Sequence, residues 1–286
     1  MLGIALVDKP QGMSSHDAVY KARRALGIKK IGHAGTLDPN ATGLLVMAVG
    51  EATRFLPYLQ LEPKVYEGVA VLGVTTATQD IEGEVLDRRS VQGVSIHDVR
   101  KAAAGLTGEL QQIPPMYSAI QIDGQRLYKL ARKGQVVERP PRAITVHEFA
   151  VESFEDDRVT FRVVCSGGTY VRTLAHDLGE ALGTGAHLAS LRRTRIGGFE
   201  VGLANAPEDL ELKSLIPLVD ALTPMPAIRL SGPAAERAKH GGEFAFAGDT
   251  TSNHLALIDD AGVYAVATRL EGIFWRPERV LPTCQK

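Results

Sequence analysis

Two strand-like runs lie almost end to end near the middle of the sequence, at residues 144–154 and 158–165. Only the acidic triplet Glu155-Asp156-Asp157 separates them. Two β-like runs joined by so short a polar turn are typical of a β-hairpin. The chain is therefore expected to contain antiparallel strand pairs.

Helix-like and strand-like segments alternate along the rest of the chain without the regular period of βαβ units. Helices are predicted at residues 16–26, 95–105 and 169–182, and further strands at 2–7, 44–49 and 65–74. Ser14 or Ser15 can cap the first helix, and Gly27 can end it. The irregular alternation favours an α+β fold with a mixed, largely antiparallel central sheet over a doubly wound fold.

A domain boundary is predicted where two prolines flank a methionine, in Thr223-Pro224-Met225-Pro226. Beyond it, short β-like runs at residues 255–258 and 263–267 stand between glycine turns. We therefore expect a large domain at residues 1–224 and a small β-rich domain at residues 225–286.

The composition is that of a globular protein, with 44% hydrophobic and 23% charged residues. The first apolar run is soon broken by Asp8 and Lys9, so neither a signal peptide nor a membrane span is expected, and the default compartment is the cytoplasm. Cys165 and Cys284 are far apart and outside any C-x-x-C pair, which predicts neither a disulfide framework nor a zinc site.

The net charge of −1 argues against a nucleic-acid partner, but the basic residues are clustered. The three basic stretches are Lys21, Arg23, Arg24, Lys29 and Lys30; then Arg126, Lys129, Arg132, Lys133, Arg139 and Arg142; then Arg192, Arg193 and Arg195. If they met on one face they would form a phosphate-binding surface, but each could equally be a separate solvated face.

The segment at residues 32–43 carries the strongest chemical signal. Glycines at positions 32, 35 and 43 let its backbone turn sharply, and Asp38 is restricted by the following Pro39. A carboxylate fixed in this way can act as a nucleophile, as a base or as a stabiliser of an oxocarbenium-like sugar. An isolated Asp-Pro pair is more commonly only a turn.

Other catalytic templates fail against the sequence. The glycines of residues 27–32 have phosphate-loop spacing, but His33 stands where that motif needs a lysine. No G-x-G-x-x-G follows a strand, His147-Glu148 lacks the second histidine of a zincin, and no metal-binding cluster emerges.

Several motifs, taken together, resemble the bacterial tRNA pseudouridine-55 synthases of the TruB family. Besides residues 32–43 they are Asp8-Lys9-Pro10-Gln11-Gly12-Met13-Ser14-Ser15, Lys64-Val65-Tyr66, Pro114-Pro115-Met116-Tyr117-Ser118-Ala119, Gly167-Gly168-Thr169-Tyr170-Val171-Arg172, Gly185-Ala186-His187-Leu188 and Leu191-Arg192-Arg193. They follow the family's order over nearly the first two hundred residues.

The resemblance implies a pseudouridine synthase fold followed by a small RNA-binding domain of the PUA kind. It implies an isomerase that acts on the T-arm of tRNA: the C–N glycosidic bond of a T-loop uridine breaks, the base rotates, and a C–C bond forms to the same ribose. Neither a cofactor nor a metal is implied, and the protein is expected to be a monomer without membrane association.

The resemblance also assigns residues. Asp38 matches the essential aspartate, which either attacks the ribose or removes a proton from it. Because a base inside a folded RNA loop must be extruded to be reached, His33 would fill the gap that it leaves and Tyr66 would stack on it. Arg172 matches the arginine that pairs with the catalytic aspartate and keeps it ionised.

Three further assignments are implied. Tyr170 and Leu191 match residues that line the uracil pocket, and Lys9 would support a loop or a phosphate. One departure concerns residues 76–80, where the family usually shows Thr-Asp-Thr: Ala77 removes one carboxylate and leaves Asp80, which puts RNA contacts through this segment in doubt.

Two other functions remain open from the residues alone. The basic stretches would suit an RNA-binding protein that helps tRNA fold without chemistry. The same aspartate could hydrolyse an N-glycosidic bond, although such hydrolysis usually needs a second carboxylate, and none stands in the segment at residues 32–43.

Overall fold

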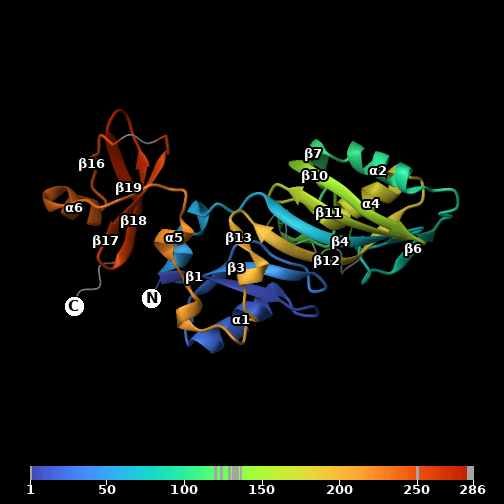
Figure 1. Ribbon diagram of the computed structural model, residues 1–286, viewed down its shortest axis with the longest axis horizontal. Helices are drawn as coiled ribbons and strands as arrows, with labels where there is room; N and C mark the ends of the chain where they lie inside the picture. The colour runs from blue at the N-terminus through green and yellow to red at the C-terminus, as the bar shows by residue number, and fades with distance from the viewer. Residues whose placement is uncertain are drawn as a thin grey trace. The chain divides into compact units, whose positions relative to one another are not determined.

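The computed structural model describes residues 2–118, 121–122, 125–127, 130, 135, 137–248 and 251–281. The chain divides into two compact units, and Figure 1 labels their helices and strands. The first unit comprises Met1–Asp38, Leu45–Gln60 and Leu203–Lys286, and the second comprises Pro39–Leu44 and Leu61–Gly202.

The first unit begins with a small sheet and one helix. Its elements are β1 (Leu2–Lys9), α1 (Ser15–Leu26), β2 (Ile31–His33), most of β3 (Thr42–Gly50), the 3₁₀ helix η1 (Glu51–Tyr58), η3 (Leu212–Ser214), β14 (Ile216–Pro217) and α5 (Leu218–Ala221). The strand order is β14-β1-β3, and β2 pairs antiparallel with β3.

Helix α1 forms where the sequence predicts it. Ser14 and Asp17 form a capping box at its start, and Gly27 ends it in the left-handed conformation with φ of 67°. Its apolar stripe, which includes Val19 and Leu26, packs against the β1 and β3 side chains in a buried core. The prediction of this helix and of its caps is confirmed.

The last part of the first unit is a five-stranded sheet with order β15-β17-β18-β19-β16. The elements are β15 (Ala227–Ile228), α6 (Gly232–Lys239), β16 (Phe244–Ala245), β17 (His254–Asp259), β18 (Gly262–Arg269) and β19 (Phe274–Val280). A separate core forms around Trp275, which is fully buried. The expectation of a β-rich C-terminal region is confirmed, and its boundary at residue 224 stays a prediction.

The second unit is built on long antiparallel strands. Its elements are β4 (Lys64–Leu72), β5 (Val74–Thr76), β6 (Val85–Arg88), α2 (Ile96–Gly105), β7 (Gly108–Gln112), β8 (Gln121–Ile122), β9 (Gln125–Arg126), β10 (Arg142–Glu155), β11 (Arg158–Cys165), α4 (Val171–Ala181), β12 (Ala186–Ile196) and β13 (Phe199–Glu200), with η2 (Val201–Leu203) at its end. The order of the main strands is β12-β4-β11-β10-β7. The predicted α+β class with a mixed, largely antiparallel sheet is confirmed.

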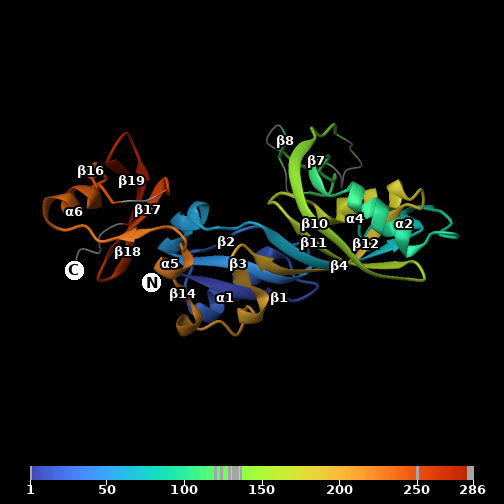
Figure 2. The ribbon, with the colours of Figure 1, turned by 45° about the horizontal axis from the view of Figure 1, so that its top comes forward.

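The predicted hairpin is present as β10 and β11, which lie side by side in both ribbon views (Figures 1 and 2). Two other predictions need correction. The run at residues 65–74 is not one strand, because Gly73 adopts φ of 84° and separates β4 from β5. Helix α4 starts at Val171 and not at residue 169, because Tyr170 keeps an extended backbone.

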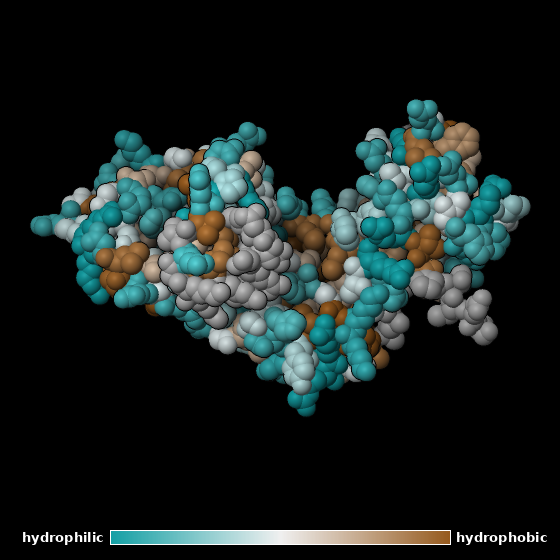
Figure 3. All heavy atoms as spheres, turned by 180° about the vertical axis from the view of Figure 1, so that it is seen from behind, coloured by the Kyte–Doolittle hydropathy of each residue, from teal (hydrophilic) through white to brown (hydrophobic). Residues whose placement is uncertain are grey.

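The surface has the mixed hydropathy that is usual for a globular protein. Hydrophilic residues cover most of the face in Figure 3, and hydrophobic ones form separate patches. Among the described residues, no helix has the length and apolarity needed to cross a bilayer.

Cys165 is a free, buried thiol, and its burial raises its pKa to about 11. Cys284 lies outside the described residues.

The start of β3 approaches β12 so closely that a side chain cannot fit between them. Thr42 and Gly43 pair with Arg192 and Arg193 of β12 in parallel register. Gly43 has φ of 99°, and a Cβ atom at this position would overlap the backbone carbonyl of Arg193. Only glycine satisfies both conditions without strain.

We predict that Gly43→Ala lowers the free energy of unfolding by about 3 kcal/mol, because the left-handed backbone and the steric overlap act together. Gly27→Ala is the matched control, since Gly27 also has positive φ but has nothing near its missing Cβ. That control should cost about 1–2 kcal/mol, the strain of the backbone alone. Urea denaturation measures both, and equal losses would contradict the role given to the contact.

Candidate active site

Asp38 lies within the loop between β2 and β3, directly after a firmly anchored residue. The preceding Leu37 is buried, and its backbone is held by Ser15 of α1: the Leu37 amide donates to Ser15 Oγ at 2.8 Å, and Ser15 Oγ donates to the Leu37 carbonyl at 3.0 Å. Asp38 itself is exposed. The fold thus holds the backbone next to Asp38 in a defined position.

Lys9 and His33, the other predicted site residues of the first unit, have different environments. Lys9 is fully buried, and its ammonium donates to the carbonyl oxygens of Pro10 at 3.0 Å and Met13 at 2.7 Å. These contacts fit the first of its two predicted roles, the support of a loop. His33 is half-buried at the end of β2, opposite Met47 of β3.

In the second unit, one face of the sheet gathers Tyr66, Leu191 and Arg193. Tyr66 is opposite Arg193 in the β4–β12 pair, and Gly68 is opposite Leu191, so these positions share a face. The guanidinium carbon of Arg193 lies 6.0 Å from the centre of the Tyr66 ring. Arg193 is buried, and its Nε donates to the Leu44 carbonyl at 2.8 Å. The sequence analysis placed Arg193 in a basic stretch and in a family motif, but assigned it no role in the site.

Helix α4 covers this same face. A Cβ atom on Gly179 would overlap Ala186, which is paired with Leu72 and therefore faces the same side as Tyr66. The chain enters α4 from Cys165, the partner of Lys64, so the helix starts at the Tyr66 end of the sheet. Tyr170 and Arg172 stand at that start.

The start of α4 is held by a glutamine that no sequence motif singled out. The Tyr170 amide donates to Gln112 Oε1 at 2.8 Å, and Gln112 Nε2 donates to the Tyr170 carbonyl at 3.1 Å. Gln112 lies at the end of β7, far away in sequence. The guanidinium carbon of Arg172 lies 5.7 Å from the centre of the Tyr170 ring.

Arg172 forms a buried ion pair with Asp80, at 3.2 Å between Nη1 and Oδ2. The two side chains are only 6% and 13% exposed. The second oxygen of Asp80 accepts a hydrogen bond from the amide of Glu82 at 3.1 Å. Asp80, whose role the sequence left open, therefore turns inwards and orients Arg172. The predicted pairing of Arg172 with Asp38 joins residues of different units and stays a prediction.

The basic stretches do not behave as continuous surfaces. In the first, Lys21 pairs with Glu208 at 3.4 Å and Lys30 with Glu51 at 2.8 Å. In the second, Lys129, Arg132 and Lys133 lie outside the described residues, as does the side chain of Arg126. In the third, Arg193 is buried and Arg195 faces the other side of the sheet. Among the described residues, no group of three or more His, Cys, Asp or Glu could hold a metal ion.

The chain matches two models of known protein families. Residues 23–171 match the N-terminal domain of the TruB family pseudouridylate synthases, and residues 172–220 match the tRNA pseudouridylate synthase B C-terminal domain. The chain belongs to the TruB family. It is therefore an isomerase that converts uridine in RNA to pseudouridine.

Similar proteins and structures agree with TruB membership. The chain is 47% identical to the tRNA pseudouridine synthase B of Thermobifida fusca (strain YX) over 84% of its own length and 85% of that protein. Its identity to the Burkholderia pseudomallei (strain 668) tRNA pseudouridine synthase B is 44%, over 98% and 97% of the two chains. A chain in the crystal structure of a Cbf5-Nop10-Gar1 complex aligns with a TM-score of 0.72 and 27% identity, covering 97% of this TruB chain and 84% of that chain.

We predict that Asp80→Asn lowers the free energy of unfolding by about 3 kcal/mol, because it removes a charged partner of a buried guanidinium. Asp87→Asn is the control, since Asp87 pairs with Arg89 at 2.8 Å on the surface and its loss should change stability little. Thermal and urea denaturation of both variants test this. The ion pair would lose its assigned importance if the two variants were equally stable.

Proposed function

We propose that this TruB-family protein isomerises the uridine at position 55 in the T-loop of tRNA, with Asp38 as its catalytic residue. The observation that carries the proposal is an exposed aspartate directly after a backbone position anchored on Ser15. The reaction adds and removes no atoms. The C–N bond to the uracil breaks, the base turns, and a C–C bond joins it to the same ribose carbon.

The target base must leave its stack before Asp38 can reach the ribose. We assign His33 to the gap left in the RNA and Tyr66 to stacking on the extruded uracil. Tyr66 fits this assignment because its ring is held in place: it is flanked by the Arg193 guanidinium and lies in a largely buried position on β4. A ring that is already ordered loses little entropy when a base stacks on it.

Leu191 and Tyr170 are proposed to line the uracil pocket. Leu191 shares the Tyr66 face of the sheet, and Tyr170 stands at the same end of that face, at the start of α4. Leu191 would supply an apolar wall that excludes water, and the Tyr170 hydroxyl can bond to the edge of the base. Exclusion of water favours return of the base to the ribose over hydrolysis.

Arg172 is proposed to pair with Asp38 and to hold it ionised and oriented. Asp80 supports this role, because its ion pair with Arg172 limits where the guanidinium can point. Asp38 is bonded directly to Pro39, and Thr42 pairs with Arg192, next to Leu191. Asp38 is thus connected by a short length of chain to the strand that carries Leu191.

The remaining assignments concern the whole protein. Residues 1–224 would form the catalytic domain and residues 225–286 a PUA-like domain that binds RNA, consistent with the separate core around Trp275. The T-arm of tRNA is the proposed substrate, and the protein is proposed to act as a monomer in the cytoplasm. No cofactor is assigned, because each proposed step is carried by a side chain or by the RNA itself.

We predict that Asp38→Asn and Asp38→Ala lower the rate of pseudouridine formation in a T-arm RNA by about 1,000-fold or more, with RNA binding retained. The isosteric Asn variant removes the charge while keeping the shape. Asp87→Asn, on the exposed β6, should retain wild-type activity. Single-turnover assays of pseudouridine and filter binding of the RNA provide the two readouts.

Three outcomes would contradict the proposal. Full activity of Asp38→Asn would remove Asp38 from the mechanism. Release of free uracil by the wild type would indicate hydrolysis. Binding or refolding of tRNA by the wild type, with no pseudouridine formed, would indicate a folding helper alone.

A further inference from the structure

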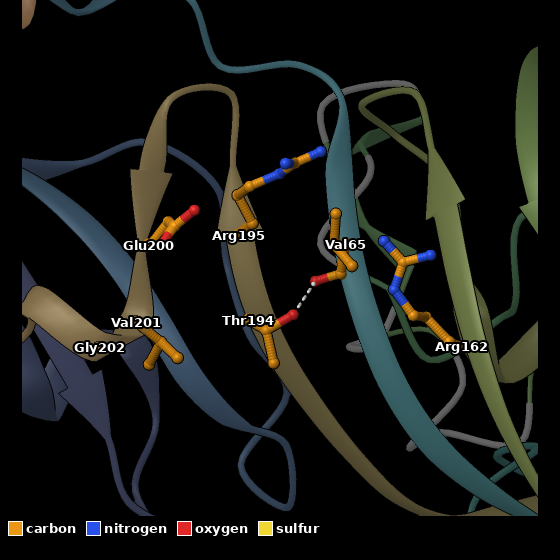
Figure 4. Close-up of a pocket in the computed structure, with 7 residues that line it drawn as sticks. All are labelled: Val65, Arg162, Thr194, Arg195, Glu200, Val201 and Gly202. Carbon is orange, nitrogen blue, oxygen red and sulfur yellow. Dashed lines mark hydrogen bonds between the residues drawn. The ribbon is translucent and has the colours of Figure 1, made fainter.

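The second unit carries a pocket of about 260 Å³ that the pseudouridine chemistry does not use (Figure 4). Val65 of β4, Arg162, Arg195 and Glu200 are among the residues that line it. Val65 directly precedes Tyr66 in a strand, so the two side chains face opposite sides of the sheet. The pocket is therefore on the face away from Tyr66.

A β-bulge in β12 puts two neighbouring polar residues into this pocket. Arg193 is opposite Tyr66 and Arg195 is opposite Val65, so one strand advances by two residues while the other advances by one. In a regular strand Arg193 and Arg195 would share a face. The extra residue, Thr194, breaks the alternation, and Thr194 and Arg195 both line the pocket.

Arg195 is a cation whose donors are not all satisfied within the described residues. Its Nε is buried and has no hydrogen-bond partner, and no ion pair is formed by Arg195 within the part of the chain that the structure describes. Glu200 is directly opposite in the β12–β13 pair but does not form a salt bridge with it. A buried donor without an acceptor is costly, which makes a bound acceptor favourable.

A second guanidinium approaches from the other side of β4. Figure 4 shows Arg162 on β11 and Arg195 on β12, flanking β4 and its Val65. Arg162 pairs with Glu148 at 2.7 Å through Nη1, which leaves its other donors for a ligand. The Thr194 hydroxyl lies 3.5 Å from the Val65 carbonyl, a long contact that a stronger acceptor could replace.

We infer that this pocket binds a phosphate group. Guanidinium groups match the oxygens of phosphate in geometry and charge, and two of them reach the pocket. The volume is below the ~300–1,000 Å³ of sites for drug-sized ligands, which suits a small anion or one group of a larger molecule. Glu200 opposes the anion, but it is exposed and can turn into solvent.

The phosphate can come from an RNA backbone or from free inorganic phosphate. Because Tyr66 faces the other side of the sheet, an RNA phosphate here would belong to a nucleotide other than the one stacked on Tyr66. The inference does not rest on the role given to Asp38. A titration with inorganic phosphate tests it even if no pseudouridine is ever formed.

The first experiment titrates inorganic phosphate into the full chain at low ionic strength and measures the heat of binding by calorimetry. Arg195→Gln should weaken binding about tenfold or more, because it removes a charge-assisted donor set. Glu200→Gln should tighten binding severalfold, because it removes the opposing carboxylate. Arg158→Gln is the matched control, an exposed arginine on the same strand as Arg162 but outside the pocket, and it should change nothing.

The second experiment measures the salt dependence of binding to a full-length tRNA transcript. If the phosphate belongs to RNA, Arg195→Gln should reduce the slope of log K against log salt by about one. If free phosphate is the ligand, the transcript binds both proteins equally and only the phosphate titration changes. Either pattern supports the site and names its source.

The inference is overturned if Arg195→Gln alters neither titration, or if Glu200→Gln weakens phosphate binding. An equal effect of Arg158→Gln would also overturn it, because the loss would then reflect net charge and not the pocket. Circular dichroism and thermal denaturation establish that each variant is folded.

Discussion

The close contact between β3 and β12 at Gly43 determines much of the second unit. With no side chain in the way, the first residues of β3 pair in parallel with Arg192 and Arg193, while the other edge of β12 pairs antiparallel with β4. This is how a largely antiparallel sheet acquires a parallel strand. It also encloses Arg193, whose burial is tolerated because its Nε donates to the Leu44 carbonyl and its guanidinium lies near the Tyr66 ring.

The site described here depends on charges that neutralise one another inside the protein. Arg172 is almost fully buried, and the cost of removing it from water is offset in part by Asp80. Asp80 is itself held by the amide of Glu82, so the pair is part of a fixed network. A guanidinium restrained in this way would need little reorganisation to form the pairing proposed with Asp38.

Local signals in the sequence predicted local structure well. Ser14 and Asp17 cap the start of α1 with their side chains, and Gly27 ends the helix in the left-handed conformation. A short acidic turn joins the strands of the β10–β11 hairpin. The motif around Asp38 could be recognised for the same reason, because its residues are consecutive in the sequence. The family resemblance then assigned residues that only tertiary structure could bring to one sheet face, such as Tyr66 and Leu191.

Contacts between residues far apart in the sequence could not be predicted from the sequence. Gln112 holds the start of α4 through two hydrogen bonds, but nothing in its neighbourhood on the chain marks it. The sequence analysis noted Asp80 only because it follows Ala77, which replaces a carboxylate usual in the family. Its ion pair with Arg172 joins residues far apart in the sequence. The arginines near the end of β12 look like one basic cluster, and only the bulge shows that Arg193 and Arg195 face opposite ways.

Strand β12 contains two such irregularities, one between Leu188 and Ser190 and one between Arg193 and Arg195. They bracket the segment that carries Leu191, so the length of this segment sets which way every side chain in it points. A single insertion or deletion there would exchange interior and exterior for the residues between it and the next irregularity, even if each residue type were preserved. Homologues are therefore expected to keep the residue count of this segment, and protein engineers should treat its length as fixed.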